Sequence, residues 1–507
     1  MNISFQKLIS KNSFVYSFLF LVTFLVYAPA LTGPFFFDDN IFIEHNISVK
    51  SFDIGKIYIS STTAGSGLQG DNFYRPNGQV IFALLYFLFG LWSPIFHFIT
   101  IILHISVGFL IFLFFCDLGI RRQYSLVGSL LFLFHPIQTE AISYISGLSE
   151  PLMAISMIGI LILFARGLLE ESGFNWKKVL AIIILTILSF FSKENAVILS
   201  GLMFITFVYL YKQGRTTNRD RALWVWTVVV SLSLIFLSLR FTIFNFTSEL
   251  TGGFGISVWN NHYTQSIFIR LTTFVSILYH YVLMILFPVG LHYETPYLSY
   301  DTLLSISAIF GLIIIFAGTY LAYRSLRYGK GIFFLAYSWF FVSILPVSGI
   351  IPTNAMYLEH WLYIPIIGII FGITYLLQEN RDNNLFIHFA IIILLIYGGL
   401  VINRNLDWAD PIRFYRNELL YTTNSARIYN NLAMEMANRN DCPDAIPYYY
   451  EAISINDTYP QTHHNLGMCL EDSGNIKEAV LEYQKALNID PSFYYSSDRL
   501  KVLLNKN

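Results

Sequence analysis

Charged residues and cysteines are both scarce in this chain of 507 residues. Asp, Glu, Lys and Arg make up 12% of it, about half of their usual share in a soluble domain. The 31 basic residues nearly balance the 32 acidic ones, so we expect no nucleic acid as a partner. Cys116, Cys442 and Cys469 are too few for a disulfide-rich scaffold, and their spacing is not that of metal ligands.

Apolar residues are present in excess, at 55% of the chain with a mean hydropathy of +0.56. We interpret the first apolar run, 14–31, as an uncleaved span rather than a signal peptide, because it is long enough to cross a bilayer and many runs follow it. The others lie at 77–91, 95–116, 124–135, 150–169, 178–191, 195–211, 222–244, 266–288, 302–323, 331–347, 361–378 and 385–402. The sequence therefore predicts an all-α fold, in which residues 1–405 form a polytopic membrane helix bundle.

Basic residues in the loops predict how the chain is threaded through the membrane. They gather at 121–122, 177–178, 212–221 and 324–330. Because Lys and Arg collect on the cytoplasmic side, we expect all four loops inside, together with the N-terminus. This threading requires 77–91 to be an interfacial or re-entrant helix, and it requires either that 266–288 does not cross fully or that 222–244 is not a simple span. It gives about eleven spans with the C-terminal tail outside. A full span at 266–288, which would put the tail inside, stays open as the alternative.

The polar tail, residues 406–507, repeats itself. Asn431-Leu432 and Asn465-Leu466 lie about 34 residues apart, as do Ala445 and Ala479, and this is the period of the tetratricopeptide helix–turn–helix unit. The tail is thus predicted to be a short α-solenoid with repeats at about 426–459 and 460–493. It serves either as a structural cap or as a binding groove for an acceptor. Antiparallel packing could bring Cys442 and Cys469 together, so a disulfide and two free thiols are both open.

Two carboxylates, Asp38 and Asp39, directly follow the first span. At the membrane interface, desolvation and mutual repulsion could raise the pKa of one of them and make it a general base. The alternative is a solvated helix end. Further along the same loop, Arg75 is either a phosphate ligand or a snorkelling anchor.

Other polar residues fall in loops of the same predicted face. His135 and Glu140 are five residues apart, which does not favour a zinc site. Lys193-Glu194 lies between two apolar runs and is either a hairpin ion pair or a phosphate site. The last candidates are Glu359, His360 and Arg404.

Taken in order, these motifs resemble one family, the transmembrane and tetratricopeptide-repeat-containing O-mannosyltransferases with their prokaryotic relatives, in the GT-C superfamily. The resemblance runs from about residue 15 to the end of the chain. It is carried by Phe37-Asp38-Asp39, Tyr74-Arg75-Pro76, His135-Pro136-x-x-Thr139-Glu140, Lys193-Glu194, Leu345-Pro346-Val347-Ser348, Glu359 with Tyr363-x-Pro365, Arg404-Asn405-x-x-Trp408 and the repeats.

The resemblance implies an inverting glycosyltransferase that moves a sugar from a polyprenyl-phosphate carrier to a hydroxyl of an extracytoplasmic protein or glycan. It implies Asp38 or Asp39 as the base and Glu140 as a second acidic residue. Further sites for the phosphate or the sugar are Arg75, His135, Lys193, Glu194, Glu359, His360 and Arg404. The family usually has Arg where this chain has His360, which is only partly charged near neutral pH.

Some alternatives remain open at this stage. The chain could instead be a non-catalytic scaffold that recruits envelope-assembly partners through its repeats, or a transporter of lipid-linked sugar. Asp38 and Asp39 could bind Mg²⁺ or Mn²⁺, and no other cofactor is expected. The short tail favours a bacterial cytoplasmic membrane, whereas a eukaryotic host would place the protein in the endoplasmic reticulum.

Overall fold

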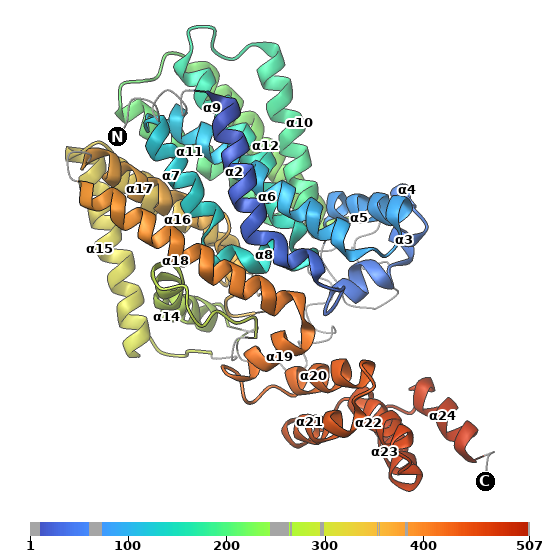
Figure 1. Ribbon diagram of the computed structural model, residues 1–507. Coiled ribbons are helices and arrows are strands. Elements are labelled where there is room, and N and C mark those ends of the chain that lie inside the picture. Colours follow the sequence, from blue (N-terminus) through green and yellow to red (C-terminus); the bar gives the residue numbers. More distant parts are fainter. Residues whose placement is uncertain are drawn as a thin grey trace. The chain divides into compact units, whose positions relative to one another are not determined.

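The computed structural model describes residues 11–59, 74–243, 263, 266–294, 299–351, 353, 355–380 and 384–504. Helices are the regular structure of these residues, and no strand occurs among them. The chain forms two compact units: a bundle unit of residues 1–291 and 297–406, and a repeat unit of residues 292–296 and 407–507. The predicted all-α fold is confirmed (Figure 1).

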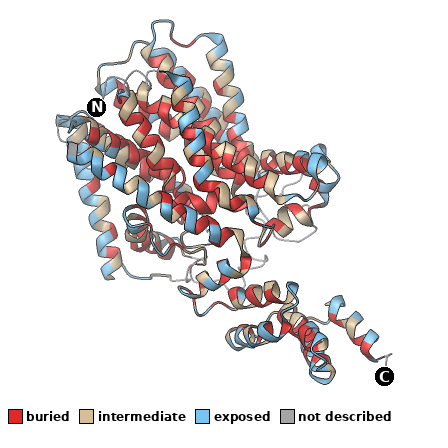
Figure 2. Cartoon of the chain, viewed as in Figure 1, coloured by how far each residue is buried: buried red, intermediate tan, exposed pale blue. Residues whose placement is uncertain are grey.

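The bundle unit is built from helices that pack apolar side chains against one another in its interior, which is red in Figure 2. They are α2 (Asn12–Tyr27), α3 (Ile47–Lys50), α4 (Ile54–Ile59), α5 (Pro76–Phe89), α6 (Ser93–Asp117), α7 (Arg122–Leu133), α8 (Thr139–Ser143), α9 (Ser149–Leu169), α10 (Trp176–Ser192), α11 (Leu199–Lys212), α12 (Arg219–Thr242), α14 (Ile267–Leu286), α15 (Ile306–Tyr328), α16 (Ile332–Ile344), α17 (Pro365–Glu379) and α18 (Asn384–Ala409).

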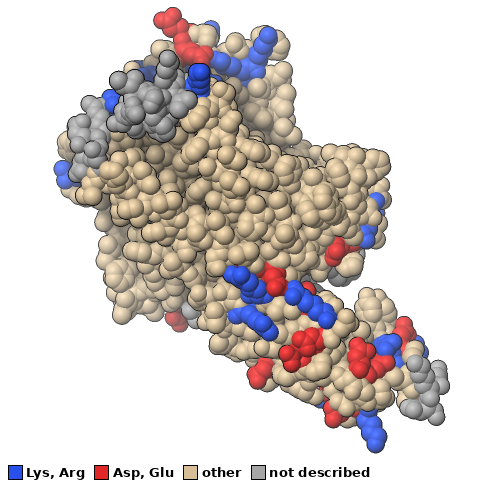
Figure 3. Space-filling model, in the orientation of Figure 1, with Lys and Arg blue, Asp and Glu red and all other residues tan. Residues whose placement is uncertain are grey.

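Within the described residues, eight helices are long and apolar enough to cross a membrane: α2, α6, α9, α11, α12, α14, α15 and α18, some of them extended by a 3₁₀ turn. The protein is therefore an integral membrane protein. Seven of the eight match predicted spans. The other four predicted spans are the shorter helices α7, α10, α16 and α17. On the face drawn in Figure 3, the middle of the bundle surface carries no charged side chain, as lipid contact requires.

Small residues allow the central helices of the bundle to approach closely. A Cβ on Gly128 of α7 would lie 2.5 Å from Thr374 Oγ1 and 2.9 Å from Phe115 Cε2, and one on Gly368 of α17 would lie 2.6 Å from Trp339 Cβ. Membrane helices associate through this kind of close packing. Lipid tails are as apolar as the side chains, so the hydrophobic effect does not drive helices together within the bilayer.

All four basic loops lie at one end of the bundle, which we call the basic end. The guanidinium of Arg122 donates to Asn12 Oδ1 at 2.5 Å, so the start of α2 lies there too. Arg121 and Lys330 both contact the end of α17, through Gln378 and Glu379. Gln213 Nε2 donates to Lys330 O, and Arg215 donates to Asp117 O, so the loop at 212–221 contacts the loop at 324–330 and the end of α6, just before the loop at 121–122. Lys178 Nζ and Asn218 Nδ2 both donate to Glu170, which brings the loop at 177–178 to the same end. This arrangement agrees with the predicted threading.

The opposite end holds the candidate residues of the predicted outer loops, and we call it the site end. Helix α14 lies along this end from start to finish. Near its start Arg270 Nε donates to Gly349 O at 2.7 Å, in its middle His280 stacks on Tyr357, and at its close Ile285 O accepts a hydrogen bond from His135 Nε2 at 3.0 Å. These contacts favour the prediction that 266–288 does not cross the bilayer, although its length alone would allow it.

The segment 77–91 forms α5, which Figure 1 shows lying crosswise to α10. Its 14 residues are too few for a span, which needs about 20. One side of the helix is buried through Gly78, Gln79 and Phe82, while Phe87 and Leu88 are exposed. An interfacial helix, as predicted, fits this pattern.

The repeat unit stacks antiparallel helix pairs, and residues 460–493 form the second repeat as predicted. Its helices are α19 (Pro411–Leu419), α20 (Ala426–Asn438), α21 (Cys442–Ile455), α22 (Pro460–Asp472), α23 (Ile476–Ile489) and α24 (Tyr494–Leu504). Gly467 of α22 faces the ring of Tyr483 on α23, where a Cβ would come within 2.7 Å. A small residue at this position is thus required for the two helices to meet.

Residues 292–294 belong to the repeat unit although they precede it in sequence by more than a hundred residues. The Glu418 carboxylate accepts hydrogen bonds from the N–H groups of Tyr293 and Glu294, at 2.9 and 2.8 Å. The Glu294 side chain in turn accepts from Ser425 Oγ at 2.8 Å and pairs with Arg427. Charge-assisted hydrogen bonds therefore hold residues 293 and 294 within the repeat unit.

A disulfide joins Cys442 at the start of α21 to Cys469 near the end of α22, with Cα atoms 5.1 Å apart. It links the two repeats. We expect the double variant Cys442→Ser/Cys469→Ser to lose about 3 kcal/mol of repeat-unit stability, because the bond closes a loop of 27 residues in the unfolded chain. The midpoint of urea unfolding measures the loss, with Cys116→Ser as the control. Maleimide should label only Cys116 in denatured, unreduced protein, and labelling of all three thiols would contradict the bond.

Candidate active site

Asp38 and Asp39 lie in a turn that ends the extended segment after α2. Phe37 adopts a positive φ of 59°, which turns the chain sharply before the acidic pair. The Asp38 N–H donates to the hydroxyl of Tyr144 at 3.1 Å. Asp39 Oδ1 accepts from Ser146 twice, from its N–H at 2.9 Å and from its Oγ–H at 2.5 Å. The acidic turn is therefore fixed to the segment 144–146, between α8 and α9.

The two carboxyl groups differ in their surroundings. Asp39 is buried, with 1% of its surface exposed, whereas Asp38 is partly exposed. Burial raises the pKa of Asp39 from 3.8 to about 8, with a smaller rise from the neighbouring Asp38 charge, against the opposing hydrogen bonds of Ser146. Asp39 is thus mainly protonated at neutral pH, and its Oδ1 is hydrogen-bonded to Ser146.

Arg75 stands immediately before α5 and beside the partly buried carboxylate of Glu194. Its Nε lies 3.4 Å from Glu194 Oε2, and the N–H of Tyr74 donates to Glu194 Oε1 at 2.7 Å. Arg240 of α12 lies 3.7 Å from the same carboxylate and 5.3 Å from the ring centre of Tyr74. Two guanidinium groups thus share one carboxylate in this corner of the site.

Lys193 follows α10 and pairs with Glu150 in the first turn of α9. Both side chains are almost fully buried. Burial lowers the pKa of Lys193 below its usual range, although the charge of Glu150 opposes this shift. The pair fits the hairpin ion-pair interpretation, and breaking it would leave a buried unpaired charge.

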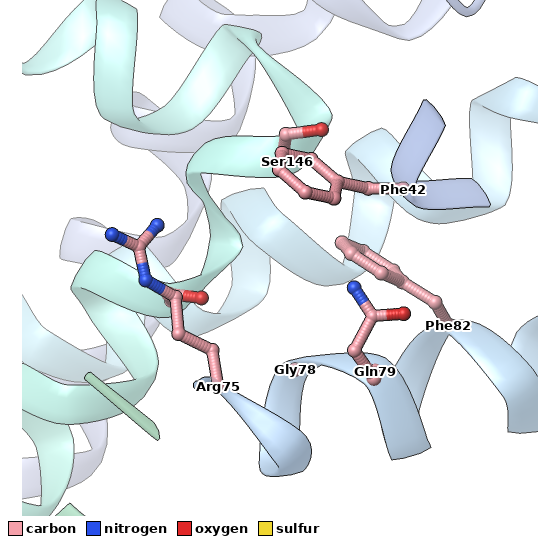
Figure 4. Close-up of a pocket in the computed structure, with 7 residues that line it drawn as sticks. Phe42, Arg75, Gly78, Gln79, Phe82 and Ser146 are labelled. Carbon is pink, nitrogen blue, oxygen red and sulfur yellow. The ribbon is translucent and has the colours of Figure 1, made fainter. Parts of the chain in front are cut away.

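A small pocket joins the acidic turn to Arg75. It is lined by Phe42, Arg75, Gly78, Gln79, Phe82, Ser146 and Ser149 (Figure 4). Ser146 connects the pocket to Asp39 through the hydrogen bonds described above. The pocket therefore has a cation on one wall and an acidic turn behind another, with aromatic rings between them.

A second cluster at the site end is built around Glu140 of α8. Its carboxylate accepts from the His360 N–H at 3.0 Å and lies 2.6 Å from His360 Nδ1. Burial alone would raise the pKa of Glu140, but the charge and hydrogen bonds of His360, with the charge of Arg404, outweigh it and lower that pKa. His360 thus contacts Glu140 through both its backbone N–H and its ring.

Arg404 of α18 is buried, and each of its guanidinium nitrogens has a partner. Nε donates to Thr139 Oγ1 at 2.8 Å, one terminal nitrogen donates to Leu291 O, and the other lies 2.7 Å from Glu359 Oε1. Glu359 is also buried. The predicted substrate-binding residues Arg404 and Glu359 therefore hold four segments of the bundle together.

Both ring nitrogens of His135 also form hydrogen bonds within the protein. Its Nδ1 accepts from the Ile137 N–H at 3.3 Å, and its Nε2 bonds to Ile285 O at 3.0 Å. Burial lowers the pKa of His135 to about 4, so the ring is neutral and serves to join α14 to the segment after α7.

Two basic residues of the site end were not predicted as site residues. Arg240 and Arg270 are both buried, at 1% and 8% exposure. Each is a lone Arg inside an apolar run of the sequence, and such a residue is costly in a membrane unless it has a role. That signal could have identified both.

A metal at Asp38 and Asp39 finds no further support. In the part of the chain that the structure describes, no group of three or more His, Cys, Asp or Glu side chains is placed to hold a metal ion. Asp71, a further acidic residue of the same loop, lies outside the described residues.

Comparison with known proteins identifies relatives that match up to 84% of this chain. Residues 460–493 match the tetratricopeptide repeat family. The chain is 22% identical to human protein O-mannosyl-transferase TMTC3 over 403 residues, which is 74% of this chain and 44% of that protein. It is 25% identical to the Caenorhabditis elegans protein O-mannosyl-transferase F38B6.6 over 453 residues, 84% of this chain and 60% of that one. A third relative, mouse protein O-mannosyl-transferase TMTC4, is 29% identical over 157 residues, which cover 26% of this chain and 20% of that protein. The chain spans about half the length of the first curated relatives it matches.

Proposed function

We propose, from the confirmed resemblance to the transmembrane and tetratricopeptide-repeat-containing O-mannosyltransferases, that this protein transfers a sugar from a polyprenyl-phosphate carrier to a hydroxyl of a protein. The observation that carries the proposal is the acidic turn beside a cationic pocket at one end of a membrane bundle. Both are needed, because the reaction requires a base for the acceptor and a cation for the leaving phosphate.

In the proposed reaction the acceptor oxygen attacks the anomeric carbon from the side opposite the carrier. Asp38 takes the proton of the acceptor hydroxyl, since it is the partly exposed member of the pair. The bond between the anomeric carbon and the phosphate oxygen breaks, and the polyprenyl phosphate leaves with one additional negative charge. Arg75 on the pocket wall stabilises that charge. Inversion at the anomeric carbon follows from a single displacement.

The other residues of the site hold this geometry. Asp39 keeps the turn in place through Ser146, and Glu194 orients Arg75. Three further pairs support the bundle at this end: Lys193 with Glu150, His360 with Glu140, and Arg404 with Glu359. We therefore propose Asp38 and Arg75 as the reacting groups and the paired residues as positioning groups.

Transfer is tested with the full-length protein in membranes. Polyprenyl-phosphate-mannose and the corresponding glucose and galactose donors are each supplied with Ser- and Thr-containing peptides. We expect a mass increase of one hexose with at least one donor, detected by mass spectrometry and removed by alkaline elimination. No transfer from any polyprenyl-phosphate sugar, while nucleotide sugars support transfer, would overturn the donor class.

We also propose that the site end and the repeats are extracytoplasmic. The basic end then faces the cytoplasm, and a disulfide in the repeat unit fits an oxidising compartment. Ile47→Cys at the site end and Lys501→Cys in α24 should react with an impermeant maleimide from the extracytoplasmic side of sealed vesicles, and Lys177→Cys should not. Labelling of Lys501→Cys only from the cytoplasmic side would mean that α14 crosses the membrane.

A further inference from the structure

Gln79, in the first turns of α5, points a buried amide group into the pocket beside the acidic turn. Its side chain is 5% exposed, and Figure 4 shows the amide nitrogen directed into the space between Arg75, Phe82 and Ser146. Within the described ranges of the chain, no group accepts a hydrogen bond from this nitrogen. The nitrogen is open to the pocket, so it is a donor that an accepting group of a bound ligand can reach.

The orientation of the Gln79 amide is fixed by the backbone of α3. The N–H groups of Ser48 and Val49 donate to Asn46 Oδ1, at 3.0 and 3.2 Å. Because a backbone N–H can only donate, this atom of Asn46 must be its oxygen. The other end of the Asn46 amide is then the NH₂ group, and it donates to Gln79 Oε1 at 3.0 Å. Gln79 must consequently present its NH₂ group to the pocket.

The rest of the lining suits a sugar. Phe42 and Phe82 offer apolar ring surface, and Ser149 offers a hydroxyl. Gly78 keeps the wall open, since a Cβ there would lie 3.3 Å from Ser149 Oγ. A pocket that combines apolar ring surface with a few oriented polar groups is suited to select among small polar ligands.

We propose that the Gln79 NH₂ group is a specificity-determining donor, which bonds to one hydroxyl oxygen of the transferred sugar while Arg75 binds the phosphate. This inference rests on the proposed function. Asn46 acts through Gln79 as a positioning residue, because it decides which end of the amide faces the sugar.

Two variants reverse the polarity of this contact by different routes. Gln79→Glu keeps an oxygen for Asn46 and places a second oxygen in the pocket. Asn46→Asp keeps the cap of α3 but can no longer donate, so the Gln79 amide turns over and presents its oxygen to the sugar. We expect each variant to lower kcat/KM for the sugar donor at least about tenfold. Gln484→Glu, at an exposed position of α23, is the matched control and should keep the wild-type value.

Deoxy-sugar donors identify the contact itself. With wild-type protein, removal of the contacted hydroxyl should lower kcat/KM about tenfold, and with Asn46→Asp the same removal should have little further effect. Equal losses in both proteins for every deoxy donor would overturn the sugar contact and leave transfer itself untouched. Wild-type rates in both variants, with normal elution and an intact disulfide, would also overturn it. Absence of transfer by the wild-type protein is a separate result, because it rejects the proposed function first.

Discussion

Asp38→Asn is expected to lower kcat for transfer about a thousandfold, because the variant cannot take the proton of the acceptor hydroxyl. KM for the donor should change little, since the donor phosphate is assigned to Arg75. The measurement is the initial rate of hexose transfer to a synthetic peptide at saturating donor. A normal rate in Asp38→Asn would remove Asp38 from the reaction.

Asp39→Asn is the matched comparison, one residue along the same turn. An amide oxygen can still accept both hydrogen bonds of Ser146, and the neutral side chain resembles the protonated Asp39. Transfer at neutral pH should therefore fall by less than about tenfold. If Asp39→Asn were as inactive as Asp38→Asn, the buried carboxyl would be the base and would have to become exposed on binding.

The raised pKa of Asp39 also predicts how its contribution to stability depends on pH. The folded protein binds the proton more tightly than the unfolded chain, at about 8 against 3.8. The stabilising contribution of protonated Asp39 is fully present below pH 3.8 and is lost as pH rises toward about 8. Comparison of melting temperatures across this window should show a steeper decline for wild type than for Asp39→Asn.

Arg404→Leu is expected to destabilise the protein by about 3–5 kcal/mol, because it leaves the buried Glu359 carboxylate without its main cation. Thr139 and the carbonyl of Leu291 lose their donors in the same step. The apparent melting temperature in detergent micelles measures the effect. The double variant Arg404→Leu/Glu359→Leu should recover part of the loss, since no buried charge then stays unpaired.

Arg413 provides a control for this prediction. It pairs with Asp407, but 43% of its side chain is exposed, so Arg413→Ala should cost less than about 1 kcal/mol. Equal melting temperatures for Arg404→Leu and Arg413→Ala would mean that the buried network is not what holds the segments together.

Long-period patterns made the fold predictable from the sequence. The repeat at about 34 residues and the placement of basic loops needed only spacing and charge sign, and the structure gathers those loops at one end. Span lengths were less predictable. Helices α7, α16 and α17 have 12, 13 and 15 residues, fewer than the roughly 20 of a typical span. Hydropathy alone did not show where these helices end.

Roles within the site depend on pairing, which the sequence does not contain. Residue type suggested that Arg404 and His135 contact the substrate, but the fold gives each of them protein partners on every nitrogen. Conversely, Arg240 lies in an apolar run that predicts only a membrane span. Its role depends on Glu194, which the fold places 3.7 Å away. Gln79 was missed because its orientation depends on Asn46, 33 residues away.

The short segment 292–294, anchored on Glu418 and Ser425, means that the repeats are not an autonomous appendage. A polypeptide beginning at Asp407 would lack the N–H groups of Tyr293 and Glu294, which donate hydrogen bonds to Glu418, a residue with only 1% of its surface exposed. Excision of the repeats at the last membrane helix would thus expose a buried negative charge. Binding studies on the repeats alone therefore need a separate peptide that covers residues 290–296. The affinity of this peptide for the excised repeats would measure how strongly segment 292–294 stabilises them.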